Sequence, residues 1–326
     1  MNILEIGGTR FLGKRLGELM LKEGHEVTII SRHPENVPEG AEVIGLERRD
    51  GVDKVSGRKF DLVIDLIGYD EPGPSQVFEE LKFGSYLLVS STWLTRLGTN
   101  IGADEEVTPK LVTGADRLPG GVREYLFKKL AAETAVLGQS RIERNAAVLR
   151  LPVMWGVGDH TRRLEFYLQR IGDKFPLICV NGGNNLAQVV WMEDIARAII
   201  IWIKRGITNT NRIWEGLPDS GIKVKKIMEN IANAMRLKLN TVDVPVELLA
   251  GELPEYLEAE PLWRLSGVRV SENNIFRFLN ICPTPQRKWM GQVAVQSQFD
   301  KIDETSRQLR DREIIFLRRV GYTLVK

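Results

Sequence analysis

A tyrosine and a lysine stand four residues apart in the segment VREYLFKKLAAETAVLG at 122–138, which has helical spacing. Residues four apart share one face of a helix, so we expect Tyr125 and Lys129 to lie side by side. A free tyrosine titrates at about pH 10, and a neighbouring ammonium group favours its phenolate. The pair therefore suits proton transfer near neutral pH. The alternative is a tyrosine and a lysine on the solvent side of an amphipathic helix.

Hydroxyl residues end an apolar run upstream of this pair. The run SYLLVSS at 85–91 predicts a buried strand that ends in Ser90 and Ser91 and is followed by Thr92. A hydroxyl there could hydrogen-bond a substrate oxygen while Tyr125 exchanges a proton with it. The serines also raise the possibility of a serine hydrolase, but no GxSxG motif surrounds them.

The chain begins with a strand-like apolar run and a glycine turn, MNILEIGGTRFLG at 1–13. Glycine accepts positive φ and lets a ligand approach the backbone, as Gly7 and Gly8 would here. A helical pattern starts at Phe11, and the free N–H groups at a helix N-terminus attract anions. We therefore predict a nucleotide phosphate site at this first strand-to-helix turn.

The second predicted strand, VTII at 27–30, is followed by Ser31, Arg32 and His33. A site selective for NAD would have an acidic residue there to hold the ribose hydroxyls, whereas a guanidinium group suits a 2′-phosphate. Arg10 in the glycine turn could face the same phosphate. We therefore expect NADP(H) in preference to NAD(H). The alternative for Arg32 is a solvated loop residue.

Strand-like runs alternate with helical segments, and this pattern predicts an α/β fold with a doubly wound parallel sheet. We expect a Rossmann-type domain over 1–160, to which 186–204 return, and a smaller, mainly helical substrate lobe over 161–326. Besides the first run and 27–30, the expected strands are 42–46, 61–68, 85–91 and 146–153.

The composition is that of an ordinary globular protein, with 43% hydrophobic and 27% charged residues among 326. The net charge of +2 gives no general attraction to nucleic acid or membranes. Residues 281–326 carry nine lysines and arginines against five acidic residues. Because the signs alternate at helical spacing, we interpret this segment as a solvated helix face, with RNA binding as the alternative.

Neither the histidines nor the cysteines have the spacing of a metal site, so we expect no metal. The cysteines form no CxxC motif, which fits a reducing compartment. The start of the chain does not resemble a signal peptide, and its longest apolar run is too short to span a membrane. We expect a cytoplasmic protein. The histidines are His25, His33 and His160, the cysteines are Cys179 and Cys282, and the longest apolar run covers 198–203.

Five segments in order over about residues 1–200 resemble the extended short-chain dehydrogenases/reductases of the NAD-dependent epimerase/dehydratase family. The resemblance implies a doubly wound domain with a small C-terminal substrate lobe. It also implies hydride transfer between a nicotinamide cofactor and a substrate carbon that bears the reacting oxygen. The segments are GGTRFLG at 7–13, SS at 90–91, YLFKKLAAE at 125–133, VLRLPVMWGVGD at 148–159 and VVWMEDIARAI at 189–199.

Carried over by motif, Tyr125 is the catalytic acid/base, and Lys129 holds the nicotinamide ribose and lowers the pKa of the tyrosine. Ser91, or Thr92 if the alignment slips by one, orients the substrate. The resemblance also implies a homodimer, paired through two long helices. The residues assigned to the cofactor site are Gly7, Gly8, Thr9, Arg10, Phe11, Leu12, Gly13, Ser31, Arg32, Ile67, Gly68, Lys129 and Pro152.

The chain departs from the family pattern at several positions. Arg10 replaces the middle glycine of GxxGxxG, as in a GGTRFLG subgroup that includes sugar-nucleotide-epimerase-like enzymes and chloroplast stem-loop RNA-binding proteins. Val153 stands where sugar-nucleotide enzymes place an asparagine, which disfavours a nucleotide-sugar substrate. Thr92 and Trp93 stand where 4,6-dehydratases have Asp-Glu, which disfavours dehydration.

These residues predict an NADP(H)-dependent reductase or epimerase that acts on a carbonyl or secondary alcohol of a carbohydrate-like small molecule, with a nucleotide-sugar still among the candidate substrates. The alternative is an RNA-binding or scaffolding protein that keeps the nucleotide-binding fold. Reductase and epimerase chemistry are not separated by the sequence.

Overall fold

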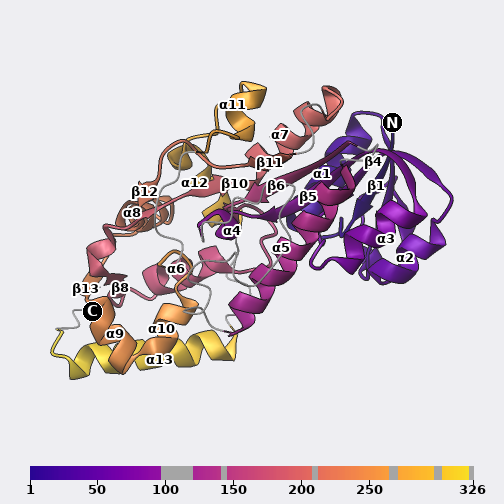
Figure 1. Ribbon diagram of the computed structural model, residues 1–326. Helices are drawn as coiled ribbons and strands as arrows, with labels where there is room; N and C mark the ends of the chain where they lie inside the picture. Colours follow the sequence, from indigo (N-terminus) through magenta and orange to yellow (C-terminus); the bar gives the residue numbers. More distant parts are fainter. Residues whose placement is uncertain (97–119, 141–144, 208–211, 264–270, 297–302, 323–326) are drawn as a thin grey trace. The chain divides into compact units, whose positions relative to one another are not determined.

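The computed structural model describes residues 1–96, 120–140, 145–207, 212–263, 271–296 and 303–322 (Figure 1). The chain divides into two compact units. The sequence placed the boundary at residue 160 and the returning segment at 186–204. Unit 1 comprises Met1–Pro152, Met192–Leu217 and Ser271–Cys282, and unit 2 comprises Val153–Trp191, Pro218–Val270 and Pro283–Lys326.

A seven-stranded sheet in the order β11-β6-β5-β4-β1-β2-β3 forms the frame of unit 1. All its neighbouring strands are parallel, and the order grows outward from β1 in both directions, which confirms the doubly wound fold class. The strands are β1 (Asn2–Ile6), β2 (Glu26–Ile30), β3 (Glu42–Ile44), β4 (Lys59–Asp65), β5 (Lys82–Ser91), β6 (Asn145–Leu151) and β11 (Arg212–Glu215).

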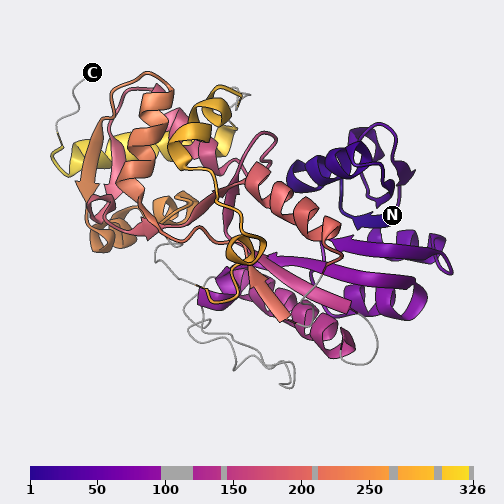
Figure 2. The same ribbon diagram turned by 90° about the horizontal axis from the view of Figure 1, so that it is seen from above.

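Helices cover both faces of this sheet, which is why its central strands are apolar along most of their length. Side chains of α2, α3 and α5 pack with strand residues in one core. In Figure 2, α5 lies on one side of the strands and α7, which packs against α1, on the other. The helices are α1 (Phe11–Lys22), α2 (Arg48–Lys54), α3 (Pro72–Glu80), α4 (Trp93–Arg96), α5 (Gly120–Ser140), α7 (Met192–Lys204) and α11 (Ile275–Leu279).

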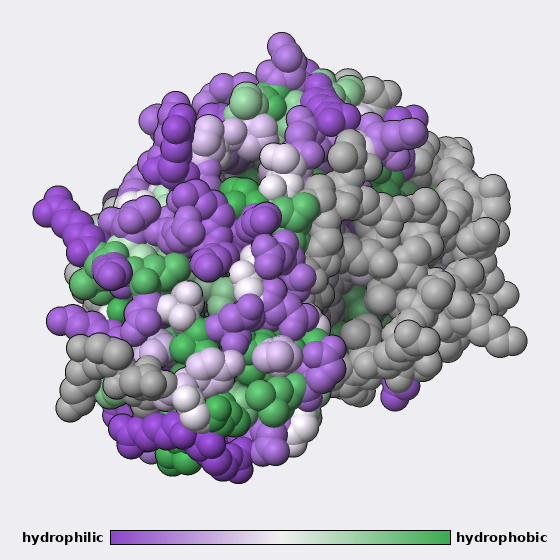
Figure 3. All heavy atoms as spheres, turned by 90° about the vertical axis from the view of Figure 1, so that its left-hand side faces the viewer, coloured by the Kyte–Doolittle hydropathy of each residue, from purple (hydrophilic) through white to green (hydrophobic). Residues whose placement is uncertain are grey.

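Unit 2 is built mainly from helices, with three two-stranded sheets among its described residues. Its surface, on the side of β8 and β13, carries hydrophilic residues with small groups of hydrophobic ones between them (Figure 3). Its elements are β7 (Val153–Trp155), α6 (Arg163–Gly172), β8 (Leu177–Val180), β9 (Leu186–Ala187), β10 (Val189–Trp191), β12 (Ile222–Lys223), α8 (Val224–Ala234), β13 (Thr241–Val244), α9 (Val246–Glu252), α10 (Pro254–Ala259), α12 (Gln286–Gln296) and α13 (Glu304–Arg319).

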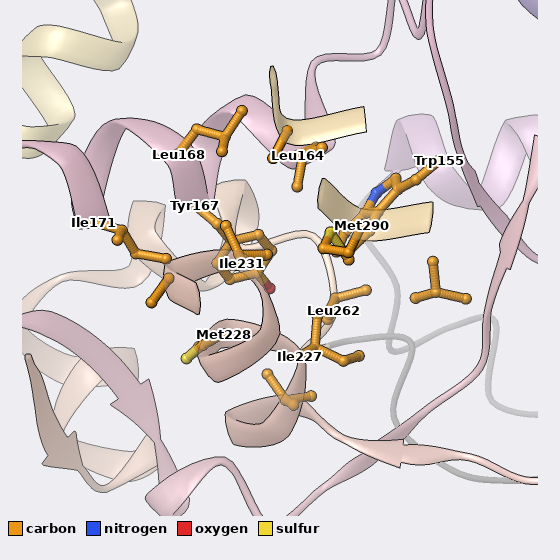
Figure 4. Close-up of a cluster of buried hydrophobic side chains, with 14 of the residues drawn as sticks. Trp155, Leu164, Tyr167, Leu168, Ile171, Ile227, Met228, Ile231, Leu262 and Met290 are labelled. Atoms are coloured by element: carbon orange, nitrogen blue, oxygen red, sulfur yellow. The ribbon is translucent and has the colours of Figure 1, made fainter. Parts of the chain in front are cut away.

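The core of unit 2 lies between α6, α8 and α12. Figure 4 shows Leu164 and Tyr167 of α6 facing Ile231 of α8, with Trp155 and Met290 beside them. This separate core explains why the contacts divide the chain in two. Within the described ranges, the helices are too short or too polar to cross a membrane.

Candidate active site

The glycine turn after β1 packs against the loop that follows β4. Gly7 has φ of +94°, and a Cβ on it would lie 2.6 Å from Ile67 Cγ2. A Cβ on Gly13 would lie 2.6 Å from Leu66 Cδ1. These two positions therefore require glycine, and the turn brings the predicted residues Gly7 and Ile67 together.

Arg10 stands where a middle glycine would be expected, and the backbone shows why it is tolerated. Its φ of −137° is extended, and the left-handed conformation falls on Phe11, with φ of 45°. No side chain caps the N-terminus of α1, and its first turn carries no acidic residue. Leu12 is buried in the core, so only its backbone faces the turn. The helix start keeps the electropositive character that a phosphate site needs.

Side chains join this turn to the end of β2. The hydroxyls of Thr9 and Ser31 lie 2.7 Å apart and are buried. Arg10 Nη2 donates to His33 Nε2 at 2.9 Å. Arg32 lies at the surface instead, where it pairs with Glu47 at 3.5 Å. The sequence placed His33 at the end of this strand, but its contact with Arg10 went unnoticed because the two residues are 23 positions apart.

Lys129 is buried at the carboxyl ends of β4 and β5. Its Nζ donates to Gly68 O at 2.7 Å and to Val89 O at 3.2 Å. Burial lowers the pKa of this ammonium group, against the attraction of Asp65 and Glu133. The structure thus brings together Lys129 and Gly68, two residues assigned to the cofactor site. The alternative prediction of a lysine on the solvent side of the helix is wrong for Lys129, since only 6% of it is exposed.

Tyr125 lies one helical turn before Lys129 and is half-buried. Its ring packs on Tyr69 of the loop after β4, with centroids 5.5 Å apart. Leu126 and Leu130 of the same helix form a small core with Leu94, and Tyr125 packs against it. Tyr125 therefore has one edge in an apolar environment, at the same loop that carries Gly68.

The hydroxyl residues at the end of β5 differ in their contacts. Thr92 is buried and donates its N–H and its hydroxyl to Leu151 O, at 3.1 and 3.4 Å. Ser91 is half-buried, and its hydroxyl accepts a hydrogen bond from Trp93 N at 3.3 Å. Among the described residues, the buried hydroxyl of Ser90 has no partner. Pro152, another assigned residue, follows β6 as the last residue of its segment of unit 1.

An ion-pair network missed by the sequence reasoning supports the loop after β4. Arg48 of α2 donates to both carboxylate oxygens of Asp65, at 2.8 and 2.6 Å. Tyr86 O–H also donates to Asp65, and Ile67 N donates to it at 3.1 Å. Burial alone would raise the pKa of Asp65, but the guanidinium group holds it below its usual value. Asp65 thus fixes the loop whose Gly68 carbonyl binds Lys129.

A second buried pair holds α5 on the sheet. Arg150 of β6 donates to Glu133 of α5 at 3.0 Å through Nε and at 2.6 Å through Nη2, and both side chains are buried. Glu133 lies one turn beyond Lys129 on the same helix. The pair therefore sets the position of the helix that carries Tyr125 and Lys129.

Side chains in the described ranges form no cluster of three or more histidine, cysteine or acidic residues that could hold a metal ion. A nicotinamide cofactor fits the residues present, since no side chain caps the N-terminus of α1 after the glycine turn and no acidic side chain follows β2 directly.

No protein-family model matches the chain. The chloroplast stem-loop binding protein of 41 kDa b from Arabidopsis thaliana is 25% identical to it over 219 residues. The match covers 61% of this chain and 54% of that protein, so the chain spans about half the length of the curated relative that it matches.

Solved structures with similar folds include several sugar-nucleotide enzymes. An epimerase of Methanothermobacter thermautotrophicus superposes with a TM-score of 0.65 at 15% identity, covering 95% of this chain and 94% of that one. A UDP-glucose 4-epimerase of Thermotoga maritima, solved with UDP-glucose, gives 0.63 at 14%, covering 91% and 98%. A dTDP-glucose 4,6-dehydratase of Bacillus anthracis, solved with NAD, gives 0.63 at 12%, covering 92% and 97%. At these identities, the likeness shows the fold.

Proposed function

We propose that the protein is an NADP(H)-dependent oxidoreductase or epimerase of the extended short-chain dehydrogenase/reductase type. Its substrate is a carbonyl or secondary alcohol of a carbohydrate-like small molecule. The observation that carries this proposal is the buried ammonium group of Lys129 on the carbonyls of Gly68 and Val89, one turn from Tyr125. The glycine turn after β1 lies at the same carboxyl edge of the sheet.

The number of hydrogen-bond donors on Lys129 supports the proposal that it binds the ribose of the cofactor. An ammonium group has three N–H donors, and backbone carbonyls take two of them. The third donor suits a ribose hydroxyl. The same positive charge stabilises the phenolate of Tyr125, which brings the tyrosine closer to the pKa that proton exchange near neutral pH requires.

The remaining residues have separate tasks in this proposal. The glycine turn and the start of α1 bind the pyrophosphate, and Arg10 and Arg32 bind the 2′-phosphate. Ser91 or Thr92 orients the substrate oxygen, and Tyr125 donates a proton to that oxygen or accepts one from it. The nicotinamide, when bound, supplies the hydride acceptor or donor. These assignments suit a reductase and an epimerase equally.

Cofactor binding tests the proposal most directly. We expect NADPH to bind at least about tenfold more tightly than NADH, since a guanidinium–phosphate bond contributes more than about 1.4 kcal/mol. Lys129→Met should weaken NADPH binding, whereas Lys128→Met should not, because Lys128 pairs with Glu124 at the helix surface. Fluorescence titration of the three proteins measures this. Equal affinities for NADPH and NADH would refute the NADP assignment, and equal effects of the two lysine variants would refute the role of Lys129.

RNA binding is the second candidate, because the curated relative is named a stem-loop binding protein. The basic C-terminal helix α13 gives it little support. Arg310, Arg312 and Arg319 of this helix form ion pairs with carboxylates of unit 2. Arginines paired in this way are less available to RNA phosphates.

A further inference from the structure

The ring of His33 lies between a cation and an anion, and each contacts one of its two nitrogens. Its Nε2 is 2.9 Å from Arg10 Nη2, and its Nδ1 is 3.3 Å from Glu35 Oε1. A guanidinium group can only donate, so Nε2 must be the acceptor. In this arrangement Nε2 accepts from Arg10, and Nδ1 faces the carboxylate of Glu35.

The backbone of His33 is held at the junction of the two turns that form the predicted ribose site. His33 N donates to Ser31 Oγ at 3.1 Å, and this hydroxyl contacts Thr9 Oγ1. The backbone of His33 is thus anchored beside the glycine turn, where its ring contacts Arg10. The charged groups that contact its ring are Arg10 and Glu35. The preceding residue in sequence, Arg32, pairs with Glu47.

We propose that His33 takes up a proton when the 2′-phosphate of NADP binds beside Arg10, so that His33 makes cofactor selectivity depend on pH. This inference rests on the proposed function. In the free protein, the positive charge of Arg10 opposes a proton on Nε2. A phosphate dianion attracts the guanidinium group to itself and offers an acceptor to Nε2–H. Glu35 then stabilises the imidazolium from the other side.

The proton comes from solvent, and no covalent bond changes. The affinity for NADP⁺ should therefore rise as the pH falls from 8.5 toward 6.5, by at most about tenfold for each pH unit, the limit for uptake of one proton. The affinity for NAD⁺, which lacks the 2′-phosphate, should not follow this trend. Below about pH 6 the phosphate itself gains a proton, so the useful range lies above that value.

Titration calorimetry at pH 7 in buffers of different ionisation enthalpy measures the proton directly. We expect wild-type protein to take up a proton with NADP⁺ but not with NAD⁺. His33→Gln should abolish this uptake, whereas His160→Gln, which replaces an exposed histidine of unit 2, should keep it. The phosphate by itself would release a proton on binding as the dianion, so the sign separates the two sources.

Tight NADP⁺ binding without proton uptake would overturn the inference and leave the proposed function intact. Uptake that persists in His33→Gln would also overturn it, since another group would then be responsible. A protein that binds NADP⁺ no better than NAD⁺ at any pH would overturn both this inference and the NADP assignment. The affinity of His33→Gln for NAD⁺ serves as a check that the variant is folded.

Discussion

Two adjacent lysines of α5 have pKa values that shift in opposite directions, because their surroundings differ. Lys128 is exposed and pairs with Glu124 at 2.7 Å, and this hydrogen bond raises its pKa. Lys129 is buried on two backbone carbonyls, and burial lowers its pKa. A buried cation acts strongly on a neighbouring phenol because water does not screen it. Lys129 is therefore the lysine that suits Tyr125.

Tyr125→Phe removes the proposed acid/base and keeps the ring that packs on Tyr69. We expect turnover to fall at least about a hundredfold, because general acid–base catalysis contributes about 10²–10⁴. NADPH affinity should stay near that of the wild type, because only the hydroxyl is lost. Single-turnover kinetics with a ketone substrate panel would measure the first effect and fluorescence titration the second. Tyr69→Phe is the control, and wild-type turnover in Tyr125→Phe would show that another group moves the proton.

Glu5 is a buried acid that the proposed function does not use. It is fully buried in β1, and neither carboxyl oxygen has a hydrogen-bond partner among the described residues. A Cβ on Gly8 would lie 2.5 Å from Glu5 Oε2, so the carboxyl group lies directly beneath the glycine turn. Burial raises the pKa of Glu5 well above 4.5. The folded protein therefore favours the protonated acid.

Glu5→Leu should stabilise the protein, and more so at higher pH. The unfolded chain releases the proton of Glu5 above about pH 4.3, whereas the folded chain retains it, so wild-type stability falls as the pH rises toward the folded pKa. We expect a gain of about 1–3 kcal/mol in the free energy of unfolding at pH 8, the usual cost of an unsatisfied buried group, and a smaller gain at pH 5. Denaturant titrations at both pH values measure it.

Glu5→Gln separates charge from polarity in this experiment, because glutamine cannot ionise but leaves a buried amide. It should lose the pH dependence and gain less stability than Glu5→Leu. A stability difference between Glu5→Leu and wild type that is the same at pH 5 and pH 8 would contradict this account.

At the scale of elements, the end of β4 connects three parts of unit 1. Asp65 accepts hydrogen bonds from Arg48 near the start of α2, from Tyr86 of β5 and from the following loop. That loop contacts the glycine turn through Ile67 and binds Lys129 through Gly68. Asp65 therefore links α2 directly to the loop, and through the loop it also helps to position α5.

Asp65→Asn should cost about 3–5 kcal/mol of unfolding free energy, because it leaves the largely buried Arg48 without its counter-ion. The double substitution Arg48→Met with Asp65→Asn should recover part of this loss, since no unpaired charge remains. Urea denaturation of the single and double variants and of Arg48→Met forms a double-mutant cycle. Additive effects in this cycle would show that the two residues do not act as a pair.

At the scale of the whole molecule, charge is balanced by internal pairing. The net charge is only +2. Arg310 of α13 binds Asp173 and Glu313, at 2.7 Å in each case, and Arg170 of α6 binds Glu313 from its other side. The basic C-terminal segment thus holds unit 2 together through buried ion pairs. The sequence predicted a solvated helix face here; this is wrong for Arg310 and Glu313, which are buried, and holds for Arg307 and Arg312, whose side chains are exposed.

Affinity for stem-loop RNA should depend only weakly on salt. A protein that neutralises six to ten phosphates loses about 10³–10⁵ in affinity between 50 and 200 mM salt, and we expect a loss of less than about tenfold here. Filter binding or fluorescence anisotropy over this salt range measures the slope. A loss of about a thousandfold would favour the RNA-binding candidate and would mean that cations outside these ion pairs contact the phosphates.

The local sequence pattern predicted six of the seven strands of the sheet in unit 1 and their order along the chain. Apolar runs such as 27–30 and 85–91 correspond to β2 and β5, because a strand buried on both faces needs continuous apolar side chains. The glycine turn was predictable for a similar reason, since backbone geometry at Gly7 admits few other residues. Short elements such as α2 and β11 were missed, because a segment of seven residues or fewer is too short to show a repeating spacing of apolar residues.

The pairing of polar groups depends on tertiary packing. Lys129 and Gly68 are 61 residues apart, Arg48 and Asp65 are 17 apart, and Arg10 and His33 are 23 apart. It also returned 192–217 and 271–282 to unit 1. Secondary structure follows from the local pattern of apolar and polar residues, which can be read along the chain. The partner of a buried charge depends on how distant elements pack, and no local pattern records that.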